Sequence, residues 1–103
     1  MALDQPTREN LELAPVLHAL SDPQRLRIVR ALAEDPEPRP CGTFGLEVSK
    51  STATHHFRVL REAGIIEQRT EGTAKLNTLR RDDLDARFPG LLDAVLDSAA
   101  APA

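Results

Sequence analysis

Side chains that can form hydrogen bonds and ion pairs recur along residues 49–64. On a helical period, Ser51, Thr54, His55 and Arg58 fall on one side of this segment. Short hydroxyl and imidazole groups can contact base edges in the major groove, and a guanidinium can pair with a phosphate. The spacing therefore predicts a helix that reads DNA.

The opposite side of this segment is apolar. Ala53, Phe57 and Leu60 recur at i, i+4 and i+7, which places them on one face of a helix. Ser49 can accept hydrogen bonds from the first helical turn, and Gly64 can adopt the left-handed conformation that ends a helix. We expect a helix between these two caps.

Two helices are predicted earlier in the chain. Residues 9–20 have a leucine-rich side and form a helix that is disturbed near Pro15. Ser21 and Gln24 have the spacing of a capping box, so a second helix begins there and runs to about Ala33. After these two helices the chain becomes rich in proline.

A proline-rich stretch follows. Residues 35–40 contain three alternating prolines and are expected to form an exposed linker. Residues 41–48 are expected to form a short third helix and turn, although Gly42 and Gly45 disfavour helix. This segment leads directly into the DNA-reading helix.

The residues after Gly64 change to an extended pattern. Residues 65–70 and 75–80 predict two strands of a hairpin, with Gly72 in its turn. A last helical region begins at residues 82–83 and is broken or restarted at 88–90. The expected fold is mainly α with a small β-hairpin, a winged helix-turn-helix of about five helices.

The length of 103 residues supports one domain. We expect a flexible N-terminus over residues 1–8, a DNA-binding and dimerisation domain over 9–98, and a tail over 99–103. The chain has no apolar run suited to a membrane span and no signal-peptide pattern, so a cytoplasmic location is expected. The sequence contains no Gly-rich phosphate loop and no pattern that would bring a base and a nucleophile together. We therefore do not expect an enzyme.

Charge is distributed unevenly along the chain. The net charge is −3, which by itself is unusual for a DNA-binding protein. Residues 39–81, however, contain eight basic and four acidic residues, for a local charge of +4, whereas residues 1–38 and 82–103 carry −3 and −4. Because phosphates respond to the local field, the basic middle of the chain is compatible with DNA binding.

Two separate motifs resemble a known family. Residues 19–28 read ALSDPQRLRI, residues 49–66 read SKSTATHHFRVLREAGII, and Glu71-Gly72 stands at the expected hairpin tip. Over about residues 12–98 the chain resembles the ArsR-type (ArsR/SmtB) winged helix-turn-helix regulators. The resemblance implies a homodimeric repressor whose first and last helices form the dimer interface.

Geometry and resemblance together give a set of site residues. The expected DNA contacts are Lys50, Ser51, Thr52, Thr54, His55, Arg58 and Arg61 on the helix, with Arg69 and Lys75 on the hairpin. The expected dimer contacts are Leu13, Val16, Leu17, Leu91, Leu92, Val95 and Leu96. A two-fold dimer predicts an inverted-repeat operator with half-sites about 34 Å apart, or a multiple of that spacing. His56 is expected to have a structural role, because it lies close to the apolar stripe.

The chain departs from the metal-sensing members of this family. The thiolate sensors have Cys-x-Cys in the third helix, where this chain has only Cys41, and residues 82–103 contain no His. We therefore predict no metal and no cofactor.

Two alternatives to a simple DNA-binding repressor stay open. A helix that began at Cys41 would favour the thiolate and make the repressor responsive to oxidation. A winged helix can also act as a protein-interaction module without contacting DNA. An unknown small-molecule effector is a further expected partner, but no residue pattern indicates where it binds.

Overall fold

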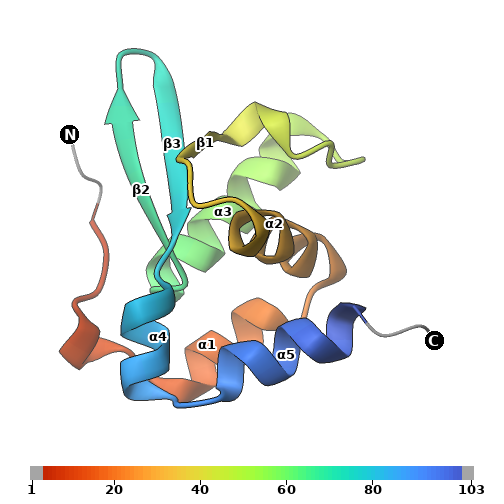
Figure 1. Cartoon of the computed structure of the whole chain (residues 1–103). Helices are drawn as coiled ribbons and strands as arrows, with labels where there is room; N and C mark the ends of the chain where they lie inside the picture. The colour runs from red at the N-terminus through yellow and green to blue at the C-terminus, as the bar shows by residue number, and fades with distance from the viewer. Residues whose placement is uncertain (1–3, 101–103) are drawn as a thin grey trace.

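A β-hairpin projects from a helical body (Figure 1). The computed structural model describes residues 4–100. Within them the α-helices are α1 (Leu13–Leu20), α2 (Pro23–Glu34), α3 (Lys50–Ala63), α4 (Arg81–Arg87) and α5 (Leu91–Ala100). The strands are β1 (Arg39–Pro40), β2 (Ile66–Glu71) and β3 (Ala74–Leu79), and 3-10 turns are η1 (Arg8–Asn10) and η2 (Cys41–Thr43). The expected winged helix-turn-helix, mainly α with five α-helices, is confirmed.

The sheet has one strand more than the predicted hairpin. Its order is β1-β3-β2, and both pairs are antiparallel. The predicted linker over residues 35–40 is therefore wrong at its end, because Arg39 and Pro40 pair with Asn77 and Leu76. Pro40 is tolerated since β1 lies at the edge of the sheet.

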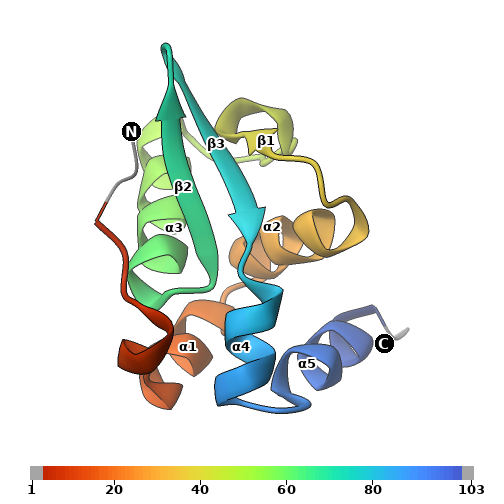
Figure 2. The ribbon, with the colours of Figure 1, turned by 60° about the vertical axis from the view of Figure 1, so that its left-hand side comes forward.

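The core lies where α1, α2 and α3 pack together and against the base of the hairpin. Its aliphatic members come from almost every element, in keeping with the low aromatic content of 3%. The most deeply buried are Leu11, Val16, Ala19, Ile28, Val29, Leu60, Ile65 and Ile66. Figures 1 and 2 show α1, α4 and α5 gathered at the end of the molecule opposite the hairpin tip. No helix in the described part of the chain is long and apolar enough to cross a membrane.

The first helix begins later than predicted. Residues 8–10 form η1, and α1 begins at Leu13, which places Pro15 within the first turn. A proline is tolerated there because the backbone N–H groups of the first turn have no partner within the helix. Pro15 therefore lies near the start of α1 and does not disturb its middle.

The cap of α2 is Asp22, and the predicted capping box at Ser21 is wrong. Asp22 Oδ1 accepts hydrogen bonds from the backbone N–H groups of Gln24 at 2.8 Å and Arg25 at 3.2 Å. Ser21 Oγ donates instead to the carbonyl oxygen of His18. Burial raises the pKa of the Asp22 carboxyl, but the two backbone donors together with the nearby His56 and Arg25 side chains outweigh it and hold the pKa below its usual value.

The predicted third helix over residues 41–48 is also wrong. The segment forms only the three-residue turn η2 and then continues without regular structure to Ser49. Gly45 has φ of +66°, which a helix does not accommodate. The apolar side chain of Phe44 is nevertheless buried, its ring centroid 5.3 Å from that of Phe57. The segment thus contributes to the core without being helical.

The expected segment boundaries at the two ends differ from the structure. Within the predicted flexible N-terminus, Gln5 forms hydrogen bonds with Gln68, and Arg8 Nε lies 2.7 Å from Asp83 Oδ1. The hydrogen bond from Arg8 lowers the pKa of Asp83 and outweighs the opposing effect of burial. The helix α5 continues through Ala100, so a tail that begins at residue 99 is placed too early. Residues 1–3 and 101–103 lie outside the described residues.

Candidate nucleic-acid interface

Helix α3 is capped as the sequence predicts. Ser49 Oγ accepts a hydrogen bond from the backbone N–H of Thr52 at 3.2 Å. Gly64 has φ of +84°, and its N–H is bonded to the carbonyl oxygens of Leu60 and Arg61. Both ends of α3 are therefore fixed by the residues immediately around it.

The polar side of α3 is exposed along the first two turns. Lys50, Ser51, Thr52, Thr54, His55 and Arg58 are all exposed. Near the N-terminus, Ser49 Oγ also contacts the hydroxyls of Ser51 at 3.2 Å and Thr52 at 2.9 Å. Thr54 Oγ1 donates to the carbonyl oxygen of Lys50 at 2.9 Å. The Thr54 hydroxyl is thus oriented with its lone pairs available as acceptors.

The inner side of α3 anchors it to the body. Phe57 and Leu60 are buried, and Ala53 is half-buried, which confirms the predicted apolar stripe. The adjacent histidines point to different environments, since His55 is exposed and His56 is buried. The predicted structural role of His56 is confirmed.

His56 has a partner that sequence reasoning missed. Arg25 is buried on α2, and its Nη1 lies 3.1 Å from His56 Nδ1. Because an arginine only donates, Nδ1 is the acceptor and His56 carries its ring proton on Nε2 in this contact. Arg25 also donates to the carbonyl oxygens of His18 and Ala19. These bonds join α1, α2 and α3 in one buried cluster.

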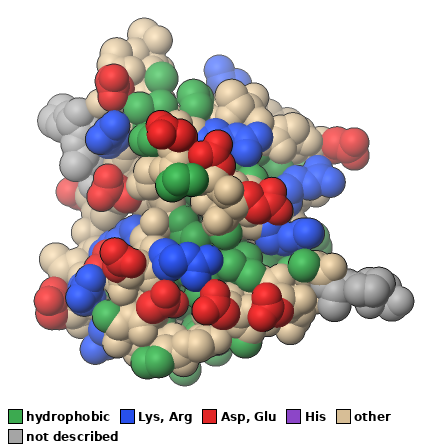
Figure 3. Space-filling view, viewed as in Figure 1, with side chains coloured by type: hydrophobic (Ala, Val, Ile, Leu, Met, Phe, Trp, Pro, Cys, Tyr) green, Lys and Arg blue, Asp and Glu red, His purple; other side chains and the backbone are tan. Residues whose placement is uncertain are grey.

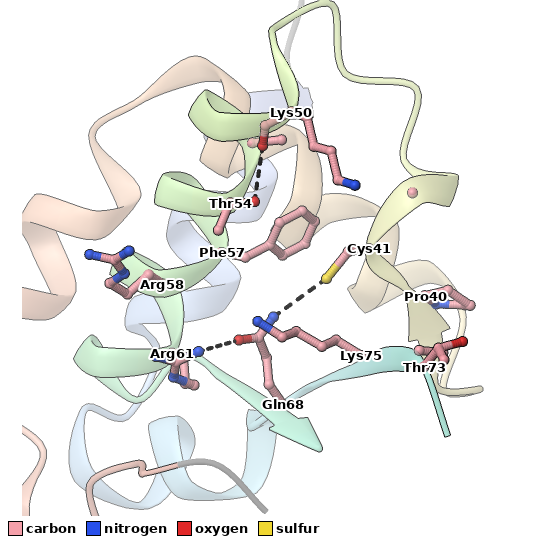
Figure 4. A pocket seen from close by; sticks show the side chains of 13 residues that line it. Pro40, Cys41, Lys50, Thr54, Phe57, Arg58, Arg61, Gln68, Thr73 and Lys75 are labelled. Carbon is pink, nitrogen blue, oxygen red and sulfur yellow. Dashed lines mark hydrogen bonds between the residues drawn. The ribbon is translucent and has the colours of Figure 1, made fainter. Parts of the chain in front are cut away.

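Arg61, a predicted phosphate contact, faces the sheet instead. It is half-buried, and its Nη1 donates to Gln68 Oε1 at 2.7 Å (Figure 4). Gln68 Nε2 in turn donates to Asn77 Oδ1 at 2.8 Å, and both Gln68 and Asn77 are buried. This chain of hydrogen bonds sets the position of α3 relative to the hairpin.

The two predicted basic residues of the hairpin lie on opposite faces. Side chains alternate between the faces of a strand, and directly paired residues of neighbouring strands share a face. Lys75 pairs with Thr70 and lies on the same face as buried Gln68, toward α3, whereas Arg69 lies on the outer face. Arg69 Nη2 lies 3.6 Å from Glu71 Oε2. The structure therefore brings Lys75, but not Arg69, to the face shared with α3.

Cys41 lies at the end of this polar chain. Its Sγ is an acceptor for Asn77 Nδ2 at 3.2 Å and for Gln68 Nε2 at 3.5 Å. The α-helix that was expected to begin at Cys41 is absent, and the three-residue turn η2 is too short to supply a helix dipole. The physical basis of the redox hypothesis is therefore wrong.

The predicted dimer residues divide into two groups. Leu13 and Leu17 on α1 are 47% and 45% exposed, as an interface needs. Val16 and Leu92 are 1% and 2% exposed, so they are core residues of the chain itself, and their assignment to an interface is wrong. Leu91, Val95 and Leu96 are half-buried against that core.

A group of acidic residues lies on α4 and α5. Figure 3 shows several acidic side chains over the lower part of the drawn face, where α4 and α5 lie. The carboxylates of these two helices are Asp82, Asp83, Asp85, Asp93 and Asp97. In residues 4–100, no three His, Cys, Asp or Glu side chains come together as metal ligands. These two helices therefore place five carboxylates at the end of the molecule opposite the hairpin tip (Figure 1).

Comparison with known proteins identifies the family. A helix-turn-helix domain model matches residues 20–69. The chain is 37% identical over 84 residues to the HTH-type transcriptional regulator YceK of Bacillus subtilis, which covers 80% of this chain and 84% of YceK. The chain belongs to the ArsR family of helix-turn-helix transcriptional regulators. Its relatives are transcriptional regulators and not enzymes.

Solved structures share the architecture of this ArsR-family chain. The transcriptional repressor BigR from Xylella fastidiosa matches with a TM-score of 0.64 at 27% identity, over 86% of this chain and 87% of BigR. An ArsR family transcriptional regulator matches with a TM-score of 0.66 at 16% identity, over 96% of this chain and all of that chain. The second match shows the winged helix-turn-helix fold alone.

Proposed function

We propose that this ArsR-family regulator is a cytoplasmic homodimeric repressor that binds an inverted-repeat operator. The observation that carries the proposal is the exposed polar side of α3, backed by a buried apolar side that fixes the helix to the body. A helix of this kind fits the major groove, where donors and acceptors distinguish all four base pairs. Repression is proposed by analogy with BigR, a transcriptional repressor.

The roles of the contact residues follow from their position on α3. Ser51, Thr52, Thr54 and His55 are short enough to contact base edges, and Thr54 offers acceptor lone pairs and a methyl group. Lys50 and Arg58 are long and exposed, which suits phosphates on either side of the groove. Arg61 contributes by holding the angle between α3 and the hairpin through Gln68.

The hairpin acts as the wing. Its turn has Gly72 at φ of +62°, which keeps the tip narrow. We propose that the tip lies along the adjacent minor groove, with Lys75 on the α3 side and Arg69 on the outer side contacting its backbone.

The proposed dimer uses the end of the molecule opposite the wing tip. Leu13 and Leu17 are the large hydrophobic residues that stay exposed in the described chain, and both lie on α1. We propose that half-buried Leu91 and Val95 on α5 also contribute to this interface. Pairing through this end leaves α3 and the wing of each protomer free to contact DNA.

Footprinting and stoichiometry on the DNA upstream of its own gene test the proposal. We expect two protected half-sites about one helical turn apart, or a multiple of this, with two chains per site. Affinity should fall steeply as salt rises, because phosphate contacts release counterions. A single asymmetric half-site occupied by one chain would contradict the dimeric proposal.

A further inference from the structure

A pocket lies between one side of α3 from Lys50 to Arg61, the segment Pro40–Gly42 and the inner face of the wing (Figure 4). Its volume is about 580 Å³, within the range of roughly 300–1,000 Å³ that small-molecule sites occupy. On one side it is bordered by Cys41 and Gly42, the first two residues of η2. The pocket thus lies beside the surface proposed to face DNA.

The lining of this pocket is basic at its sides and apolar at its centre. Figure 4 shows Lys50 and Lys75 reaching into the space from opposite walls, with the Phe57 ring between them and facing Cys41. Ala53 and Pro40 add further apolar surface. The lining residues include no Asp or Glu in the part of the chain that the structure describes.

Arg61 adds an unused donor to the same pocket. Its Nη1 is bonded to Gln68, but its Nε is buried and makes no hydrogen bond to any residue from 4 to 100. The guanidinium keeps its positive charge beside the pocket, which Arg61 lines together with Arg58. Two lysines and two arginines without a carboxylate among the described lining residues favour a ligand with negative charge.

We propose that this pocket binds a small organic anion, a carboxylate or sulfonate attached to an aromatic ring. The acidic group lies between Lys50 and Lys75, and the ring packs on Phe57. An inorganic anion would leave the apolar centre unfilled, and a neutral ring would form no ion pair with the two lysines. Because Lys50 and Thr54 line the pocket and also face DNA, the bound anion competes with DNA. This competition rests on the proposed function, whereas occupancy of the pocket does not.

Titration of the free protein with naphthalene-1-sulfonate, followed by amide chemical shifts, tests occupancy. Naphthalene-1-methanol has the same ring without the charge, and sodium sulfate has the charge without the ring. We expect saturable shifts at Cys41, Ala53, Phe57 and Ala74, with weaker binding of both comparison compounds. Shifts confined to other surfaces, or equal binding of sulfate or of the alcohol, would overturn the proposal.

Matched variants connect the binding to the two lysines. Lys50→Ala and Lys75→Ala should each weaken naphthalene-1-sulfonate binding by about fivefold, the effect of an exposed ion pair. Arg69→Ala removes the same charge from the outer face of the wing and should change the affinity by less than about twofold. If all three variants lose the same amount of affinity, the assignment of the site is overturned. The sulfonate would then respond only to the overall positive charge of the surface.

A second measurement separates this proposal from the proposed function. Naphthalene-1-sulfonate should raise the apparent Kd of the wild-type chain for its upstream DNA, and naphthalene-1-methanol should not. If the sulfonate occupies the pocket and DNA affinity is unchanged, the proposed competition is overturned. If the chain does not bind DNA at all, the proposed function fails while the shift titration still decides whether the pocket binds anions.

Discussion

Arg25 Nη1 lies 3.1 Å from Nδ1 of His56, a contact that ties α2 to the inner side of the helix proposed to read DNA. Both side chains are buried, with 6% and 7% of their surface exposed. His55, the next residue toward the N-terminus, faces solvent. Two adjacent histidines therefore have separable environments, one in the core and one on the exposed side of α3 that we propose contacts DNA.

Replacement of His56 should destabilise the fold. His56→Ala leaves a donor of Arg25 buried without its acceptor and opens a cavity, which together cost about 2–3 kcal/mol in the free energy of unfolding. His55→Ala, the matched control on the exposed side, should change it by less than about 0.5 kcal/mol. Urea denaturation followed by circular dichroism measures both. Equal stabilities of the two variants would contradict the assigned role of His56.

Gly64 should tolerate no side chain. Its φ of +84° is strained for other residues, and an added Cβ would collide with Leu11 Cδ2. We expect Gly64→Ala to lower the free energy of unfolding by more than about 2 kcal/mol. Gly72→Ala has a similar φ of +62° but open space around the new Cβ, so it should cost only about 1 kcal/mol. Comparable thermal unfolding midpoints for the two variants would show that contact with Leu11 is unimportant.

The ion pair between the N-terminal segment and α4 should give a pH-dependent contribution to stability. Asp83 has a lowered pKa because Arg8 and Arg80 donate to its carboxylate, so the folded chain favours the charged form. This stabilisation is present above the unfolded-state pKa of about 4 and is lost as pH falls through the lower pKa of the folded state. Asp83→Asn should therefore cost about 1 kcal/mol at pH 7 and almost nothing near pH 2.

Unfolding free energies of wild type and Asp83→Asn, measured from pH 7 down to pH 2, check this prediction. Asp97→Asn, an exposed change on α5, is the control and should show little difference at any pH. If the wild type is still more stable than Asp83→Asn by the same amount at pH 2, the charge of the carboxylate is not the cause of the difference.

Exposed leucines of α1 should control assembly. Leu17→Asp places a charge on the proposed dimer surface and should raise the dimer dissociation constant at least about tenfold without unfolding the chain. Leu92→Asp instead places a charge in the core and should prevent folding. Light scattering and circular dichroism distinguish these outcomes. A Leu17→Asp chain with the wild-type mass at all concentrations would place the interface elsewhere.

Local sequence signals predicted α3 well because its determinants are local. Ser49 and Gly64 cap the helix through their own backbone neighbours, and the spacing of Phe57 and Leu60 reflects a single buried side. The same reasoning identified the hairpin, since Gly72 lies between two alternating strands. These features need no knowledge of distant residues.

The errors arose where distant contacts decide the outcome. Residues 41–48 were expected to include a short helix, but Phe44 packs beside Phe57 from a segment that is irregular after η2. The bond from Arg61 to Gln68 on the wing was not predicted, because the two residues meet only in the folded chain. Leu92 looked available for a partner chain, and it is covered by the chain's own core. In each case the residue type indicates which interactions the side chain can make, but the surroundings of the side chain depend on residues distant in the sequence.

The central claim is that α3 reads base sequence, and discrimination between specific and non-specific DNA tests it most directly. We compare wild type with Thr54→Ala/His55→Ala on its upstream operator and on a scrambled duplex at one salt concentration. The control, Thr7→Ala/His18→Ala, makes the same chemical changes at exposed positions outside α3. All three chains are first checked for wild-type fold and mass.

We expect the Thr54→Ala/His55→Ala chain to lose at least about tenfold in operator affinity, while its affinity for the scrambled duplex stays within about twofold. The control should match wild type on both duplexes. An unchanged ratio of the two affinities in the α3 variant would contradict the account, since α3 would then not be the element that reads the sequence.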